Sequence, residues 1–546
     1  MPETPTGSAA PADNVVRSAG VVSLAVFSSR ITGLVREQVF AAMFGAGQIF
    51  DAFRIAFLIP NLTRDLFAEG ALSSAFVPVF TEYLSTKSRE EAARLANLVA
   101  SAIVVIVGSL CLLGAIFSPQ LVMLIASGFV NDPEKFQMAV TMTRIMFPFL
   151  LLVALAAQAM GILNACGRFG VPATASTMFN IISLLAGLTL GKVLGPFIGL
   201  SDIYGMAWGV VVGGAAQLLW QLPALRAAGF SFSPSLDWSH PGLRRILLLM
   251  GPAIIGNAAV QINVSVNTNF ASRLGDGPVS WLNYAFRFMQ LPIGIFGYAI
   301  ASATLPSISR SAAARDFETF RQTLSRSLGM VFLLTVPSAI GLAVLGEVIV
   351  GAIYEYAAFT AEDTRATAQA LSCYAIGLAG YAAVKVLNPA FYALGDSRTP
   401  MAISIGSVAI NAAVAVVAVT LAGLGHAGLA LSTSSVAVFS AVALFIIMRN
   451  RIGGIYGRNL WRSFSKVAIA SVVMGAVVYV VTHGLSNLLG TGKIARLLNL
   501  AVTISAGMAV LYFACRLLKV PELEAAVSSL AGPLRRRLPY LRSRPS

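Results

Sequence analysis

Long apolar segments alternate with short polar segments along almost the entire chain. Each apolar segment is about 20 residues long, the length that an α-helix needs to cross a hydrocarbon core ~30 Å thick. Fourteen such segments can be placed, and they leave no room for a sizeable soluble domain. The pattern predicts an all-α polytopic membrane protein. The predicted spans are centred near residues 28, 60, 108, 150, 185, 215, 257, 294, 335, 380, 411, 438, 475 and 507.

The composition agrees with a lipid environment. Hydrophobic residues make up 57% of the chain and charged residues 11%, and the mean hydropathy is +0.79, whereas soluble domains carry about 25% charged residues. Residues 1–14 are polar and lack the basic segment of a secretory signal, so we expect the first span to be retained. The four cysteines are scattered without ligand spacing, so we expect neither a disulfide framework nor a metal site.

Basic residues are unevenly distributed over the loops. When the loops are assigned alternately to two sides, one side is far more basic, and it includes Arg89, Arg168, Arg226, Arg321 and Arg451. The positive-inside rule makes that side cytoplasmic, and an even number of spans places both termini there. The net charge of +15 then reflects topology and attraction to anionic inner-leaflet phospholipids, rather than nucleic-acid binding.

The two halves of the chain repeat short motifs. ALSSAFVP, which ends at Pro78, returns as AIASATLP, which ends at Pro306. NACGRFGVPA, which contains Pro172, returns as YALGDSRTPMA, which contains Pro400. Both pairs have the same offset, 306 − 78 = 400 − 172 = 228. Because both predicted six-span halves start on the same side, the repeat is parallel, as in some alternating-access transporters.

The repeat predicts the organisation of the whole chain. The predicted segments are a polar cytoplasmic N-terminus at 1–14, an N-lobe of six spans at 15–230, a C-lobe of six spans at 240–450, two appended spans at 460–520 and a basic cytoplasmic tail at 521–546. We find no phosphate-binding glycine loop, metal-ligand cluster or nucleophile triad. We therefore expect a transporter without catalytic residues or a cofactor.

The predicted spans contain more basic than acidic residues. An ionised side chain in lipid costs at least ~2.5 kcal/mol, so such groups usually face a water-filled cavity or a partner. The residues concerned are Arg30, Arg36, Arg54, Arg64, Arg144, Arg287 and Lys385, against Glu37, Asp51, Asp65 and Glu69. Snorkelling or local pairing would explain individual residues, such as Arg64 beside Asp65. A cavity that binds phosphate through planar guanidinium groups would explain the whole set.

Breaks in the spans also recur in the two halves. AFRIAFLIP, which contains Arg54 and ends at Pro60, returns as AFRFMQLP, which contains Arg287 and ends at Pro292. Gly33 lies between the two arginines of the first span. Gly33, Pro60 and Pro292 are candidate hinges, although a static kink that aids packing is an equally good interpretation.

Several longer motifs point to one family. They are SRITGLVRE from Ser29, PNLTRDLFAEGALSSAFVP from Pro60, VSWLNYAFRFMQLPIGIFG from Val279 and VKVLNPAFYALGDSRTP from Val384. Together they resemble the MurJ (MviN) lipid II flippases of the multidrug/oligosaccharidyl-lipid/polysaccharide exporter superfamily, and the resemblance extends from residue 15 to about residue 520. It implies two six-helix lobes with two extra helices. It also implies transport of the undecaprenyl-diphosphate-linked peptidoglycan precursor, lipid II, between the leaflets of a bacterial inner membrane.

The resemblance also assigns roles to residues. By motif, the diphosphate-binding residues are Arg30, Arg36, Arg64 and Arg287, and the supporting residues are Asp51, Arg54, Glu69, Lys385 and Gln290. For Asp51 and Glu69, structural pairing is the alternative. The chain departs from the family at Asp65, where many relatives are basic, and at Arg54, where they tend to be apolar. Phe286 and Gln290 also flank Arg287 where acidic residues are expected, so the cavity should be slightly more positive than in relatives.

The expected mechanism is a rocking of residues 15–230 against residues 240–450, driven by the membrane potential, a monovalent cation gradient or downstream consumption of the product. Residues 460–520 would form either an apolar groove for the lipid tail or an ordinary lipid-facing surface. We expect a monomer that works beside cell-wall synthesis enzymes.

Other functions are open from the sequence. An exporter of the same superfamily could carry another lipid-linked glycan or a drug, but a cavity for cationic drugs should be acidic. A membrane-embedded glycosyltransferase or ligase would need an acidic residue in a long extracytoplasmic loop, and the loops near 118–135 and 354–366 are short.

Overall fold

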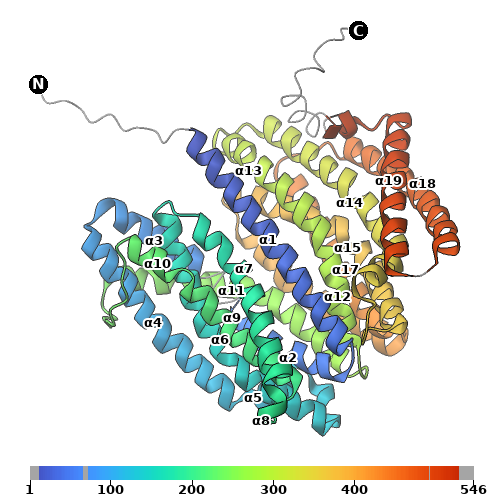
Figure 1. Ribbon diagram of the computed structural model, residues 1–546. Coiled ribbons are helices and arrows are strands. Elements are labelled where there is room, and N and C mark those ends of the chain that lie inside the picture. Colours follow the sequence, from blue (N-terminus) through green and yellow to red (C-terminus); the bar gives the residue numbers. More distant parts are fainter. Residues whose placement is uncertain (1–11, 65–71, 491, 525, 528–546) are drawn as a thin grey trace, which may run out of the picture. The chain divides into compact units, whose positions relative to one another are not determined.

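The computed structural model of the chain describes residues 12–64, 72–490, 492–524, 526 and 527 (Figure 1). Every regular element in these residues is a helix. The chain divides into two compact units, Met1–Gln261 and Ile262–Ser546. The division falls inside α11 (Pro241–Ser272), so the first part of this helix packs with the first unit.

The first unit combines long helices with several short helices and turns. They are α1 (Ala12–Phe44), α2 (Gln48–Arg64), α3 (Ser73–Thr86), α4 (Arg89–Ile116), α5 (Ser118–Ile125), the 3₁₀ turn η2 (Ser127–Asn131), α6 (Pro133–Ala165), α7 (Gly170–Leu188), the π-helical turn η3 (Thr189–Val193), α8 (Gly195–Ile198), α9 (Asp202–Leu219) and α10 (Leu222–Ala227). One apolar core joins α3, α4, α6 and the start of α11, with Phe80, Leu95, Leu150 and Leu243 buried at its centre.

The second unit contains the remaining helices. They are the rest of α11, α12 (Pro278–Pro292), the π-helical turn η4 (Ile293–Gly297), α13 (Tyr298–Ala313), α14 (Phe317–Tyr354), α15 (Ala361–Ala393), α16 (Arg398–Val416), the π-helical turn η5 (Val417–Leu421), α17 (Gly425–Arg451), α18 (Gly457–Leu489) and α19 (Lys493–Leu517). Its main core joins α13, α14, α15 and α17, with Phe320, Leu324, Phe391 and Met448 fully buried.

Helix boundaries confirm the internal repeat. Helix α6 becomes α15 after a shift of 228 residues at both ends, because 361 − 133 = 393 − 165 = 228. Helix α7 and turn η3 become α16 and η5 after the same shift, because 398 − 170 = 416 − 188 = 417 − 189 = 228. The two halves therefore share one helical plan, down to the wider turn that ends their fifth predicted span.

The predicted class, an all-α polytopic membrane protein, is also confirmed. Within the described residues, eleven helices are long and apolar enough to cross a membrane. Three of the fourteen predicted spans correspond to helices outside these eleven: α1, the α2–α3 pair and α11. The total of fourteen stays a prediction.

Helices α18 and α19 pack side by side and against α14 (Figure 1). Polar groups join α18 to α19 in the apolar interior: the Asn499 amide donates to the Thr482 carbonyl and to the Ser486 hydroxyl, both at 3.0 Å. Arg496 Nη2 donates to Glu355 Oε1 at 2.8 Å, which ties the start of α19 to the end of α14. The appended pair is therefore firmly attached to the second unit.

Glycines bring α7 and α9 into close contact. A Cβ at Gly205 would lie 2.2 Å from the backbone nitrogen of Gly191, and a Cβ at Gly209 would lie 2.4 Å from the Ser183 carbonyl oxygen. Small residues of this kind let helix backbones approach in a membrane. The close approach sets Met206 and Val210 of α9 beside Ser183 of α7, where they form one wall of the pocket described next.

Candidate functional site

Four arginines lie on α1 and α2, two of them nearer to the turn that joins these helices and two farther from it. A short turn at residues 45–47 joins the two helices. At 1.5 Å per residue, Arg36 lies about 12 Å before the end of α1, and Arg54 lies about 9 Å after the start of α2. On the same scale Arg30 lies about 21 Å, and Arg64 about 24 Å, from this turn. Arg30 is exposed, and the other three are partly buried.

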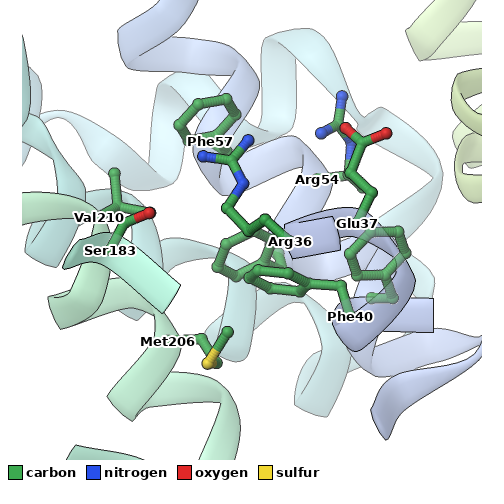
Figure 2. Close-up of a pocket in the computed structure, with 10 residues that line it drawn as sticks. Arg36, Glu37, Phe40, Arg54, Phe57, Ser183, Met206 and Val210 are labelled. Carbon is green, nitrogen blue, oxygen red and sulfur yellow. The ribbon is translucent and has the colours of Figure 1, made fainter. Parts of the chain in front are cut away.

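The level nearer the turn contains a pocket (Figure 2). Its charged residues are Arg36, Glu37 and Arg54, and Ser183 and Met206 contribute to the opposite wall. Figure 2 shows the Arg36 side chain directed toward the Phe57 ring, and the Glu37 carboxylate on the side of the pocket that holds Arg54. The pocket therefore collects two cationic groups and one anionic group from two neighbouring helices.

Aromatic rings line the same pocket. The Phe53 ring lies between those of Phe40 and Phe57, with centroid distances of 4.7 and 6.4 Å. The Arg36 guanidinium lies 5.2 Å from the centroid of Phe179, and that of Arg54 lies 6.0 Å from the centroid of Phe57. Cation–π contact favours these guanidinium positions. The rings also limit the water around both groups, which strengthens their attraction to an anion.

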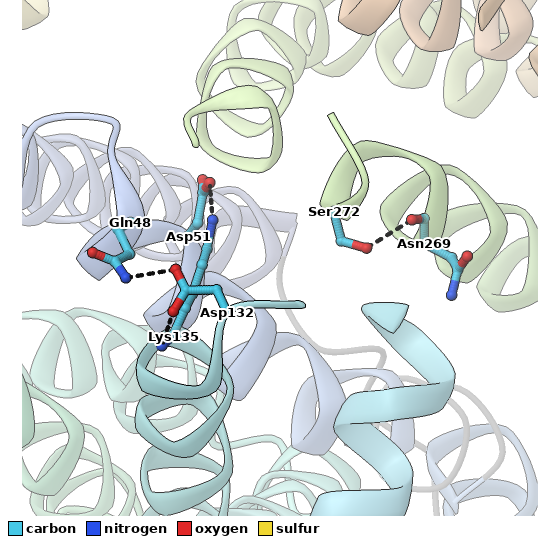
Figure 3. A network of polar contacts seen from close by, with 6 residues as sticks. All are labelled: Gln48, Asp51, Asp132, Lys135, Asn269 and Ser272. Atoms are coloured by element: carbon cyan, nitrogen blue, oxygen red, sulfur yellow. Dashed lines mark hydrogen bonds and ion pairs between the residues drawn. The ribbon is translucent and has the colours of Figure 1, made fainter. Parts of the chain in front are cut away.

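Asp51 belongs to a buried ion pair beside this pocket (Figure 3). Lys135 Nζ donates to Asp51 Oδ2 at 3.1 Å, and the two side chains are 3% and 0% exposed. Lys135 Nζ also lies 4.3 Å from the centroid of Phe129. The Asp132 side chain caps α6 by accepting from the Lys135 backbone N–H, and it accepts from the Gln48 amide at 2.8 Å.

These contacts join the start of α2 to the start of α6. Structural pairing, the alternative interpretation of Asp51, is what the structure shows. A supporting role for Asp51 toward a substrate stays a prediction.

In the second unit the candidate residues lie on α12 and α15. Arg287 and Gln290 are both exposed, and as residues three apart they share one face of α12. Lys385 Nζ lies 4.7 Å from the ring centroid of Tyr298. The structure thus places Arg287 and Gln290 together, and Lys385 beside an aromatic ring, in one unit.

The three hinge candidates have different surroundings. Gly33 lies inside the uninterrupted helix α1, where an added Cβ would lie 3.4 Å from the Asn180 amide nitrogen of α7. Pro60 is inside α2, and Pro292 ends α12 directly before the π-helical turn η4. Gly33 therefore faces α7 at ordinary contact distance, and hinge motion at Gly33, Pro60 and Pro292 stays a prediction.

Other predicted residues are placed as follows. Glu69 and Asp65 lie outside the described residues. Arg144 Nε donates to Ser118 Oγ at 3.0 Å and to the Ala115 carbonyl at 3.3 Å, so it satisfies groups near the end of α4, which fits the interfacial interpretation. Among the described residues, no group of histidines, cysteines and carboxylates could hold a metal ion.

Sequence reasoning missed Lys135 as the partner of Asp51. The two residues are 84 positions apart, and Lys135 looked like an ordinary loop cation at the start of a span. The only available signal was the carboxylate of Asp51, which needs a nearby positive group if it is ionised inside a membrane protein.

Comparison with known proteins decides the family. The family described as "Lipid II flippase MurJ" matches residues 40–500 of the chain. A lipid II flippase MurJ of Burkholderia cenocepacia is 36% identical, over 85% of this chain and 90% of its own length. A probable lipid II flippase MurJ of Rhizobium meliloti is 34% identical, over 92% and 93% respectively. The chain belongs to the lipid II flippase MurJ family.

Solved structures agree with the MurJ assignment. The chain is similar to a structure of "Lipid II flippase MurJ, inward closed conformation", with 26% identity, a TM-score of 0.74 and coverage of 91% of this chain and 99% of that one. An inward-facing multidrug transporter of the MATE family matches with 16% identity and a TM-score of 0.64, covering 80% of this chain and 95% of its own, which shows a shared fold alone. The MurJ family and the many apolar helices together identify a multi-pass bacterial membrane protein.

Proposed function

We propose that the chain moves lipid II from the cytoplasmic to the periplasmic leaflet, and that arginines on α1, α2 and α12 bind its diphosphate during the passage. The observation that supports this proposal is membership of the MurJ family, combined with arginines at the family motif positions. Arg30, Arg36 and Arg64 are distributed along about 12 Å of the first unit. Arg287 is exposed on α12 of the second unit.

The chemistry of arginine suits this substrate. A guanidinium offers five N–H donors in a plane, matches two phosphate oxygens at once and stays charged at every physiological pH. The diphosphate is the part of lipid II for which hydrocarbon is the worst solvent, because its charge would be buried unpaired. Arginines at successive depths would compensate that charge while the polyprenyl tail remains in lipid.

The mechanism needs no covalent step. We infer alternating movement of two lobes, with both termini in the cytoplasm and with no cofactor. A membrane potential of 100 mV is worth ~2.3 kcal/mol per elementary charge moved across it, so arginine-bearing helices could respond to it. A monovalent cation gradient is the other candidate energy source. Anionic inner-leaflet phospholipids are the proposed partners of the basic loops, and the monomer is the proposed working unit, beside cell-wall synthesis enzymes.

The competing exporter of cationic drugs is disfavoured by charge. A cation-binding pocket should have an excess of carboxylates, whereas the pocket of the first unit holds two arginines and one glutamate. Lipid II is the substrate that the family supports.

The first test uses bacteria depleted of their own flippase. Cells that express this chain should expose lipid II to an externally added lipid II-cleaving enzyme. We expect Arg30→Ala or Arg287→Ala to reduce the exposed lipid II to the level of uncomplemented cells, at equal protein level, because the diphosphate loses a charged ligand.

Arg310→Ala is the matched control, because Arg310 is an exposed arginine near the end of α13, outside the proposed site. We expect it to keep most of the activity. If the wild-type chain inserts into the membrane but restores no accessible lipid II, the proposed function is wrong.

A further inference from the structure

A groove of about 610 Å³ lies on α15 and α17 of the second unit. Its volume falls within the range of ~300–1,000 Å³ that is usual for ligand sites. It is lined by Ile376 of α15 and by Leu431, Val438, Val442 and Ile446 of α17, among others. All of these except Leu431 are exposed. Because α15 and α17 are both long and apolar enough to cross a membrane, we expect the groove to face lipid.

Two serines also line the groove, but their hydroxyl hydrogens are already used. Ser434 Oγ donates to the Cys373 carbonyl at 2.7 Å, and Ser435 Oγ donates to the Leu431 carbonyl at 2.9 Å. Neither hydroxyl therefore donates into the groove. A polar ligand would lose its hydrogen bonds to water there, so the wall favours a hydrocarbon chain.

The volume of the groove selects among hydrocarbon chains. A water-sized group occupies ~30 Å³, so the groove holds about 20 such groups, as many as the carbon atoms of one long fatty acyl chain. From Leu431 to Ile446 the groove residues extend over about 22 Å of α17, so the chain would lie extended along the helix. An undecaprenyl tail has more than twice as many carbon atoms and would leave most of its length outside. The groove therefore fits an acyl chain better than a polyprenyl chain.

Arg449 continues the line of groove residues along α17. It follows Leu431 by 449 − 431 = 18 residues, which is five full turns, so both side chains leave the helix on the same face. It lies about 4.5 Å beyond Ile446, in the last turn of α17, and it is exposed. Arg451 of the same turn pairs with Asp396, whereas Arg449 has no ion-pair partner among the residues that the structure describes. An anionic headgroup at this end of the groove would meet a guanidinium.

We propose that the α15–α17 groove binds one anionic phospholipid, with an acyl chain against α17 and the phosphate on Arg449. A guanidinium matches two phosphate oxygens through parallel N–H donors. The second acyl chain of the lipid stays in the bilayer. This lipid is not the one that is transported, so the inference goes beyond the proposed function. Its assignment to the cytoplasmic leaflet rests on the proposed orientation.

The binding test measures lipid retention on the full-length protein by native mass spectrometry. The protein in detergent micelles is mixed with equal amounts of phosphatidylglycerol and phosphatidylethanolamine that carry the same palmitoyl and oleoyl chains. We expect the wild type to retain one phosphatidylglycerol several-fold more often than phosphatidylethanolamine, because only the former has a net negative charge. Dihexanoyl phosphatidylglycerol should be retained several-fold less often, because its chains are too short to fill the groove.

Arg449→Leu tests the headgroup contact. We expect it to lower retention of phosphatidylglycerol several-fold, to the level of phosphatidylethanolamine, and Arg449→Lys to recover part of it, because an ammonium keeps the charge but not the planar fork. Arg516→Leu is the matched control, because Arg516 is an exposed arginine in the last turn of another apolar helix, α19. It should retain phosphatidylglycerol like the wild type.

Val442→Trp tests the acyl chain. The indole would occupy the groove, so retention of both phospholipids should fall several-fold. Val480→Trp is the control, because Val480 is an exposed valine of α18 outside the groove. A ligand that binds the folded state raises its stability. Added phosphatidylglycerol should therefore raise the Tm of the wild type and of Val480→Trp, but not that of Val442→Trp.

Each result supports or overturns the proposal. If Arg449→Leu retains phosphatidylglycerol as often as the wild type does, or if the wild type retains both phospholipids equally, Arg449 does not bind the phosphate and the proposal is wrong. It is also wrong if the protein retains a polyprenyl diphosphate in place of phosphatidylglycerol. None of these measurements depends on export of lipid II. A chain that retains phosphatidylglycerol through Arg449 but exports no lipid II would contradict the proposed function and support the phospholipid site.

Discussion

The two halves of the molecule share several helix boundaries but differ in the charges that their helices carry. Arg36 lies eight residues before the end of α1 at Phe44, and Val264 lies eight residues before the end of α11 at Ser272. By the same measure, Arg30 corresponds to Ala258. The helix end has therefore been kept in both halves, whereas the arginines at these two positions belong to the first half only.

The same contrast appears where two helices of each half are tied together. In the first half the fourth residue of α2, Asp51, pairs with Lys135, three residues beyond the N-cap of α6. In the second half the fourth residue of α12, Trp281, donates from its indole nitrogen to Asp363 at 2.8 Å, three residues beyond the N-cap of α15. Counted from the starts of α2 and α12 and from the N-caps of α6 and α15, the same positions are joined by an ion pair in one half and by a hydrogen bond to a carboxylate in the other.

The difference shows that position, not residue type, is what the repeat conserves. Asp363 also completes a reciprocal cap with Thr360, whose side chain accepts from the Asp363 backbone N–H. The contact between Trp281 and Asp363 is therefore also supported by local contacts on α15. The contact between Asp51 and Lys135 depends on a charge supplied by another helix, and we expect it to be the more sensitive of the two contacts to substitution.

The largest effect is expected from Asp51→Asn. This change removes the carboxylate charge that pairs with the buried Lys135 ammonium, and breaking a buried pair in this way costs about 3–5 kcal/mol. The free energy of unfolding in mixed micelles, followed by circular dichroism, measures the loss. Glu362→Gln is the control, an exposed acid in the first turn of α15, and it should change stability by less than about 0.5 kcal/mol. Equal stability of Asp51→Asn and the wild type would show that the pair does not hold α2 to α6.

A smaller effect is expected from Trp281→Phe. The phenyl ring retains apolar contact but removes the donor to Asp363, and a hydrogen bond to a charged group contributes about 1.5–3 kcal/mol. Because the Thr360 hydroxyl and backbone still donate to Asp363, we expect the lower end of that range. The same unfolding measurement tests it. If Trp281→Phe lowers the free energy of unfolding more than Asp51→Asn does, the expected ranking of the two contacts is reversed.

The smallest effect is expected when both charges of the Asp51–Lys135 pair are removed together. In the double variant Asp51→Leu with Lys135→Met, neither charge of the pair remains, and such replacements are often neutral or stabilising. We expect stability within about 1 kcal/mol of the wild type, so most of the loss caused by Asp51→Asn should disappear. If the double variant is as unstable as Asp51→Asn, the polar contacts of the pair, and not its charge balance, determine stability.

Much of the fold could be predicted from the sequence, because lipid imposes a length and an apolar composition on each span. The duplication was visible for a related reason: Pro78 and Pro306, with Pro172 and Pro400, mark breaks that both halves need at the same places. The family motifs then suggested the arginines, and their contact with a substrate stays a prediction.

The contacts within the site could not be predicted in the same way. The pairing of Asp51 with Lys135 depends on how α2 and α6, which are distant in sequence, cross each other. Because the spans have similar apolar compositions, the sequence does not show which helices cross or at which residues. The pocket around Arg54 could not be predicted for another reason: Phe57 looks like an ordinary lipid-facing or core residue until packing places its ring beside the Arg54 guanidinium group.

The π-helical turns η3 and η5 lie at matching positions in the two halves. A wider turn accommodates one extra residue in a helix without shifting the residues that follow it. Both halves carry this turn at the same position of the repeat, Thr189–Val193 and Val417–Leu421. Both halves therefore end this span in a turn that can absorb a one-residue insertion, whereas they differ in charge at Arg36 and Val264. The irregular turn belongs to the backbone plan that the halves share, and the charge at that position belongs to one half.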